Sequence, residues 1–112
     1  MATKLEVLAE FCESDTSALY DHSAKDPDNG NADIDWSTFS SVKLRARGNL
    51  NRATLSPKIT GAVQTDHTKV RFDCLSLVGL GPDVYTCQVE ATDGTGVRTG
   101  DDFLITVREK VQ

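Results

Sequence analysis

The residues with the most chemistry in this sequence are three cysteines and two histidines. Three thiols, at Cys12, Cys74 and Cys87, cannot all pair within one chain. No Cys-x-x-Cys occurs, and His22 and His67 lie at no metal-ligand spacing from any cysteine, so we do not expect a zinc site. The cysteines by themselves leave two states open, which are one disulfide with one free thiol, or three buried free thiols.

Known catalytic motifs are missing from the sequence. It contains no Gly-x-Ser-x-Gly, no phosphate-binding glycine loop before a helix and no His-Glu-x-x-His. The two histidines have no partner at a diagnostic spacing, so we interpret both as surface residues. We therefore expect a protein that is not an enzyme and that needs no cofactor.

An oxygen-rich run around Asp26 and Asp28 invites a comparison with calcium loops. An EF-hand needs glycine at the sixth position and a bidentate glutamate at the twelfth. Counted from Asp26, those positions are Asn31 and Ser37, which excludes the EF-hand. A looser calcium site that includes Asp33 is the alternative, but we expect a solvated acidic loop and no metal.

The charge balance limits the class of partner. The 112 residues carry a formal net charge of −5, which argues against nucleic acid and anionic lipid as partners. No apolar run is long enough to cross a membrane, so we expect no membrane insertion. Basic residues gather at Lys43, Arg45, Arg47 and Arg52; we expect a solvated strand face, with a binding patch for acidic protein or glycan as the alternative.

Hydrophobic periodicity indicates strands and turns rather than helices. Alternation with period two is clearest over residues 84–91, where Tyr85, Cys87, Val89 and Ala91 share one face. Similar patterns predict strands at 42–47, 70–74 and 103–107, a short strand at 34–39, an irregular one within 4–12, a hairpin across 92–102 and a long polar loop at 13–33. We predict a single all-β domain over residues 1–112, a sandwich or barrel of short strands.

The first residues give no apolar leader, because Leu5, Val7 and Leu8 are interrupted by Glu6 and Glu10. Two origins are therefore open. The protein is intracellular, or the segment is a domain excised from a longer secreted chain with an added start methionine.

The run Asp83-Val84-Tyr85-Thr86-Cys87 resembles the end of strand F in immunoglobulin-superfamily domains of the variable or intermediate set. In that family a tyrosine two residues before the second core cysteine bonds to upstream backbone, which is the role this resemblance implies for Tyr85. It also implies a Greek-key β-sandwich of two antiparallel sheets. It further implies a Cys12–Cys87 disulfide between the sheets, with Trp36 against it.

The sequence also departs from the family pattern. Gly81 and Asp83 stand where the family usually has an acidic residue and a glycine, and Trp36 lies 24 residues past Cys12, which enlarges the intervening loop. These departures indicate a divergent, invertebrate-like member. The chain is similar to the N-terminal immunoglobulin-like domains of molluscan fibrinogen-related immune lectins, which are immune or adhesion proteins.

The family resemblance implies a non-enzymatic recognition or adhesion module of a secreted or cell-surface protein. Its ligand would be a protein or a cell-surface glycan, bound by loops at one end of the sandwich or by a sheet face. The candidate ligand-binding residues come from the enlarged loop and the hairpin tip: Asp26, Asp28, Asn29, Asp93, Thr95 and Arg98. The edge near residues 42–47 is a second candidate surface, for self-association. The alternative is an intracellular all-β scaffold or assembly protein with reduced, buried cysteines.

Overall fold

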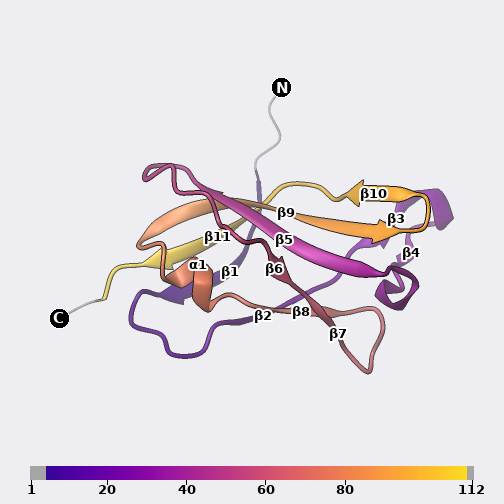
Figure 1. The fold of residues 1–112 in the computed structure, drawn as a ribbon, viewed down its shortest axis with the longest axis horizontal. Helices are drawn as coiled ribbons and strands as arrows, with labels where there is room; N and C mark the ends of the chain where they lie inside the picture. The colour runs from indigo at the N-terminus through magenta and orange to yellow at the C-terminus, as the bar shows by residue number, and fades with distance from the viewer. Residues whose placement is uncertain (1–4, 111–112) are drawn as a thin grey trace.

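The computed structural model describes residues 5–110, and these are almost entirely strands and turns (Figure 1). The strands are β1 (Val7–Cys12), β2 (Leu19–His22), β3 (Lys25–Asp26), β4 (Ala32–Asp33), β5 (Ser41–Gly48), β6 (Ile59–Thr60), β7 (Ala62–Val63), β8 (Val70–Asp73), β9 (Asp83–Asp93), β10 (Gly96–Thr99) and β11 (Phe103–Arg108). Short helices are η1 (Pro27–Asn29), η2 (Trp36–Thr38) and α1 (Leu75–Val78). The all-β class that the sequence predicted is confirmed.

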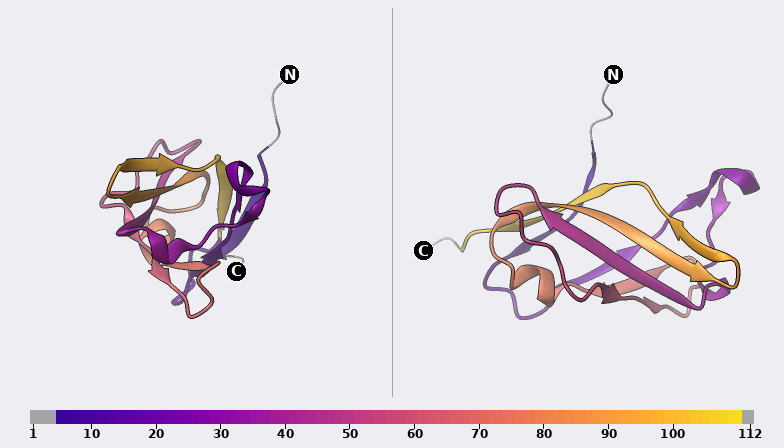
Figure 2. Two further views of the ribbon diagram at one scale, coloured as in Figure 1. Left: turned by 90° about the vertical axis from the view of Figure 1, so that its right-hand side faces the viewer. Right: turned by 45° about the horizontal axis from the view of Figure 1, so that its top comes forward.

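Two main sheets form the layers, as Figure 2 shows from two sides. The larger has the order β1-β11-β9-β5-β6, with β10 also paired to β9, and the smaller has the order β2-β8-β7. This arrangement is consistent with a β-sandwich. The expectation of two antiparallel sheets is wrong for the larger one, because β1 enters beside β11 in the same direction and pairs with it in parallel.

The alternating strands bury one face each, as their period of two predicts. In β9 the buried apolar side chains are Tyr85, Cys87, Val89 and Ala91, which are the four that the sequence placed on one face, and Asp83 is buried at the start of the strand. The core also takes residues from both sheets, from η2 and α1 and from the connecting segments: Phe11, Ala18, Tyr20, Trp36, Val42, Leu44, Ala46, Leu55, Val70, Phe72, Cys74, Leu77, Val78, Phe103, Ile105 and Val107. Fully burying one large aliphatic or aromatic side chain contributes about 1.5–3 kcal/mol, so this contiguous cluster is the main source of stability.

Two segments differ from the sequence predictions. The strand predicted at 34–39 is the 3-10 turn η2, because the Asp35 side chain caps it by accepting hydrogen bonds from the backbone N–H and hydroxyl of Ser37. The loop predicted at 13–33 contains β2 and the small β3–β4 hairpin. In β2 the buried residues Tyr20 and His22 alternate with exposed ones, but a pattern of four residues, whose two buried side chains both carry polar atoms, is too short to recognise.

The expected Cys12–Cys87 disulfide is wrong, since all three cysteines are free. In the register of the larger sheet, Cys12 lies opposite Arg108 and Cys87 opposite Phe103. These positions are five residues apart along β11, or about 17 Å, whereas the Cα atoms of a disulfide lie within about 7 Å. The half-exposed Cys12 thiol contacts the Ser14 hydroxyl at 3.3 Å instead. β1 lies at the edge of the larger sheet and has no covalent link to the core.

Tyr20 lies on the inner face of β2, between the two sheets. The Tyr20 ring stacks on Phe72, with 6.4 Å between centroids, and contacts Phe103 at 5.7 Å. Burial raises the pKa of its hydroxyl, and the nearby thiols of Cys87 and Cys74 raise it further. Aromatic packing thus joins the two sheets at this level.

A hydrogen-bonded corner anchors the start of β9. The Tyr85 hydroxyl donates to the Gly81 carbonyl at 2.6 Å, the upstream backbone contact that the family resemblance implied for this side chain. It also accepts from Asn51 Nδ2 at 3.0 Å. Asp83 completes the corner, because its buried carboxylate accepts from the backbone N–H groups of Leu50 and Asn51.

The electrostatics of the corner favour the ionised Asp83 carboxylate. Burial by itself raises the pKa of Asp83, but the hydrogen bonds from the backbone N–H groups of Asn51, Leu50 and Val84 outweigh it and leave the pKa below its ordinary value. The corner therefore ties the turn after β5 to the start of β9.

Candidate functional site

One end of the molecule carries a broad hollow between segments that lie far apart in the sequence. Figure 1 shows the β3–β4 hairpin and the β9–β10 turn at the same end, away from α1, as the sequence analysis expected for the enlarged loop and the hairpin tip. A space of about 1060 Å³, which we call the end hollow, lies beside β3, η1 and β10. Its walls come mainly from residues 22–28, 34–39 and 98–103, with further contributions from 5–8 and 88–91.

The candidate ligand-binding residues are only partly gathered by this hollow. Asp26, Asp28 and Arg98 line it, and they come from the two segments that the sequence analysis selected. The lining does not include the other three candidates, Asn29, Asp93 and Thr95. Asp93 instead shapes the hairpin turn, where its carboxylate accepts the backbone N–H and the hydroxyl of Thr95, each at 2.7 Å.

The inner wall of the end hollow is aromatic, which the sequence did not indicate. His22, Trp36, Phe39 and Phe103 all line it. The rings touch one another, with centroids 5.1 Å apart for His22 and Phe103 and 6.0 Å apart for Trp36 and Phe39. The Trp36 indole N–H donates to the Thr68 carbonyl at 3.1 Å, so Trp36 supports this wall rather than a disulfide.

His22 is the buried polar group of that wall. The interpretation of both histidines as surface residues is wrong for His22, which is 8% exposed, and is confirmed for His67, whose side chain is 59% exposed. Burial lowers the pKa of His22 to about 4. Its Nδ1 lies 2.5 Å from the Tyr20 hydroxyl, so at neutral pH the ring is an uncharged hydrogen-bonding member of the core.

Acidic side chains outnumber basic ones around the end hollow. The acids of the lining are Glu6, Asp26, Asp28, Asp101 and Asp102, against the cations Lys25 and Arg98. Lys25 is already paired with Asp33 across the β3–β4 hairpin. The open side of the hollow therefore favours a positively charged group, while its inner wall accepts apolar surface.

The loose calcium site considered for Asp26, Asp28 and Asp33 does not form in the part of the chain that the structure describes. The Asp26 carboxylate caps η1 by accepting the backbone N–H of Asp28 at 3.0 Å, and Asp33 is paired with Lys25. Within residues 5–110, no three His, Cys, Asp or Glu side chains converge in a way that could hold a metal ion.

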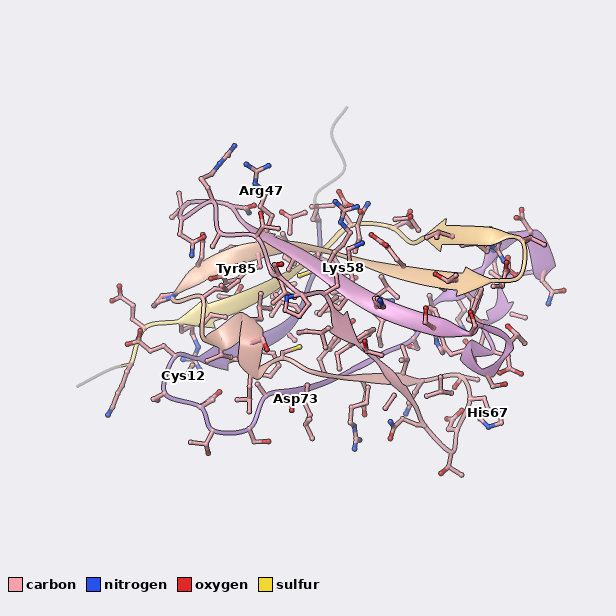
Figure 3. The ribbon with its side chains drawn as sticks, in the orientation of Figure 1. Cys12, Arg47, Lys58, His67, Asp73 and Tyr85 are labelled. Atoms are coloured by element: carbon pink, nitrogen blue, oxygen red, sulfur yellow. The ribbon has the colours of Figure 1, made fainter. Side chains whose placement is uncertain are left out.

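A second hollow of about 480 Å³ lies on the outer face of the larger sheet. Its cations are Arg45, Arg47, Arg52 and Lys58, and we call it the arginine groove. Figure 3 labels Arg47, which projects away from the ribbon, and Lys58. The sequence analysis had found three of these four residues. It had included Lys43, which the lining does not, and it missed Lys58, whose position after a turn showed no strand periodicity.

Glu90 is the acid beside the arginine groove. It forms ion pairs with Lys58 at 3.1 Å and with Arg45 at 3.2 Å. The hydrogen bond from Lys58 and the positive charges of Lys58 and Arg45 hold the pKa of Glu90 below its ordinary value. Among the described residues, Arg47 and Arg52 form no such pair.

Comparisons with protein-family models, curated proteins and solved structures found no match to this chain. None of the helices within residues 5–110 has the length and apolar character required to cross a membrane. The geometry of the two hollows is therefore the basis for the functional argument.

Proposed function

We propose that the protein is a non-enzymatic recognition module, an immunoglobulin-like sandwich that binds a segment of another protein in the end hollow. The observation that carries this proposal is the meeting of the β3–β4 region and the β9–β10 hairpin around one space of about 1060 Å³. Ligand sites are concave, largely apolar and equipped with a few polar groups that fix orientation. The aromatic wall and acidic rim provide both.

The strand order supports the immunoglobulin-like part of the proposal. In variable-type domains one sheet contains strands C′, C, F and G in that order, and the other contains B, E and D. Here β6-β5-β9-β11 and β2-β8-β7 have the same sequence order and pairing. The hydrogen bond from Tyr85 to the Gly81 carbonyl agrees with this assignment.

The chemistry of the hollow supports a peptide segment with a basic side chain next to an apolar one. A lysine or arginine would meet the excess of carboxylates at the rim, and a neighbouring apolar side chain would pack on Phe39 and Ile34. A cation over an aromatic ring gains further attraction, about 0.5–2 kcal/mol. A surface glycan, the other ligand class expected, would use the polar rim but little of this wall.

The test is selection of ligands from a phage-displayed random peptide library, with a neutral glycan array run in parallel. Peptides that combine Lys or Arg with an apolar neighbour should be enriched, and Asp26→Lys with Asp28→Lys should weaken their binding at least tenfold. The matched control is Asp73→Lys, an exposed acid on β8 outside the hollow. Enrichment of acidic peptides, equal loss in the control, or binding to glycans alone would refute the proposal.

A second candidate function is an intracellular all-β scaffold or assembly protein with reduced cysteines. The three free thiols favour it, because thiols stay reduced in the cytosol while secreted domains of this size often form disulfides. The extracellular location rested on the Cys12–Cys87 bridge. Free-thiol titration of denatured native material, with and without reductant, separates the two: three thiols throughout favour the scaffold, and one before reduction favours the secreted module.

A further inference from the structure

We propose that the arginine groove is a second binding site, for a short acidic oligosaccharide whose sulfate or carboxylate groups are bound by Arg47 and Arg52. The site is on the outer face of the larger sheet and all four of its cations lie outside the end hollow, so the proposal does not depend on ligand binding in the end hollow. The two hollows share Gln88 and Asp102.

The first argument is local charge. Four cations line the arginine groove, and Glu90 and Asp102 bring two negative charges, which leaves a local charge of +2 on a chain whose net charge is −5. Glu90 is occupied by Arg45 and Lys58. The guanidinium groups of Arg47 and Arg52 are exposed and are the ones left available for a ligand.

The second argument is the spacing of these cations. Arg45 and Arg47 lie two positions apart on one face of β5, which separates their Cα atoms by about 6.6–6.8 Å along the strand. Arg52 lies in the turn that follows β5. After this turn the chain runs back along β5, where Thr54 pairs with Arg47 in an antiparallel bridge. A guanidinium binds carboxylate or sulfate-like oxygens with two parallel hydrogen bonds, so an array of this kind suits a ligand with repeated anionic groups.

The third argument separates a glycan from an acidic protein. The uncharged lining is mostly polar, with Asn49, Thr54, Thr86 and Gln88 offering hydrogen bonds to hydroxyl groups. The only large apolar residue is Leu55, which is 4% exposed. Protein interfaces depend on a buried apolar or aromatic anchor, and this groove has none to offer. Its volume of about 480 Å³ is within the roughly 300–1,000 Å³ of small-ligand sites.

The experiment is isothermal titration calorimetry of the whole chain at low and moderate salt, with four probes. A heparin tetrasaccharide carries sulfate and carboxylate, a hyaluronan tetrasaccharide carries carboxylate only, maltotetraose is neutral, and poly-glutamate stands for an acidic protein. We expect binding of at least one acidic tetrasaccharide, weaker at higher salt, and none of maltotetraose. Heparin without hyaluronan identifies sulfate as the group bound, and hyaluronan binding shows that carboxylate suffices.

The variants locate the binding site. Arg47→Gln with Arg52→Asn should weaken binding at least tenfold; asparagine is chosen because Arg52 has a φ of 61°, a backbone state that asparagine tolerates. Lys43→Gln is the matched control, since it removes one positive charge from the same face of β5 outside the groove. Both sites are exposed, and unchanged urea midpoints will show that the variants fold. Absence of binding by both acidic tetrasaccharides, equal or tighter binding of poly-glutamate, or an equal loss in Lys43→Gln would overturn the proposal.

Discussion

Acidification from neutral pH to about pH 5 should destabilise this protein mainly through His22. Its pKa is about 4 in the folded chain against an ordinary value of 6.5, because its ring is buried. The unfolded chain therefore binds this proton first. The stability that the neutral ring contributes is complete above about pH 6.5 and is lost progressively as the pH falls toward 4.

The magnitude follows from the two pKa values. Linkage gives a loss of about 2 kcal/mol in the free energy of unfolding between about pH 7.5 and pH 5, and about 3 kcal/mol once the pH is below 4. Net stabilities are only about 5–15 kcal/mol, so this loss is large enough to measure. Asp83 acts in the same direction but at lower pH, because its pKa lies below the ordinary carboxyl range and its stabilisation is lost only as the pH falls through that value.

Urea unfolding across this pH range tests the reasoning. His22→Gln keeps a group that can accept a hydrogen bond from Tyr20 but does not titrate, so it should be less stable at neutral pH and should show little pH dependence between 7.5 and 5. His67→Gln, at an exposed histidine, should retain the wild-type slope. A wild-type slope in His22→Gln, or an NMR titration of the native His22 ring centred near 6.5, would refute the account.

Three other predictions follow from the corner, a glycine and the thiols. Tyr85→Phe removes a buried hydroxyl that makes two hydrogen bonds, so urea unfolding should show a loss of about 1–3 kcal/mol; no loss would contradict the corner's structural role. Gly48→Ala places a Cβ 1.9 Å from the Asn51 side chain and 2.6 Å from the Asp83 carboxylate, so this variant should have a lower thermal midpoint. Gly94→Ala is the control, because its Cβ meets open space and makes no such clash. In native protein, an aromatic disulfide reagent should react with Cys12 before the other two cysteines, since hydrogen bonds from Ser14 lower the pKa of the Cys12 thiol. Cys74 and Cys87 should react only on unfolding, because burial raises the pKa of each to about 12; rapid reaction of all three in native protein would show that the core is open.

The sequence was sufficient for the strands that carry long alternation. In β5, β9 and β11 every second side chain is apolar, and a strand with one face in the core has no other register that buries them all. The corner contact of Tyr85 was implied by the family resemblance of residues 83–87, and its hydroxyl does reach backbone only four residues upstream. Contacts this local depend on neighbours that the sequence places side by side.

Short elements and long-range pairings could not be read in this way. β2 is only four residues long and both of its buried side chains carry polar atoms, so its alternation is hard to recognise in the sequence. η2 forms because the Asp35 side chain caps it, which hydrophobic periodicity does not reveal. Lys58 joined the arginine groove only because β6 turns back along β5, which brings it to Glu90 from 32 positions earlier in the chain.

What the sequence determined by itself was the all-β class, the inward faces of the long strands and two of the segments that contribute to the end hollow. Only the tertiary structure decided which cysteines could meet, since the parallel entry of β1 leaves Cys12 about five strand positions from Cys87. It also decided that His22 is buried among aromatic rings, and that Arg45, Arg47 and Arg52 line one hollow while Asp26 and Asp28 line the other. The physical reason is that side-chain alternation is a local property of each strand, whereas strand order and register are set by how all the inner faces pack together.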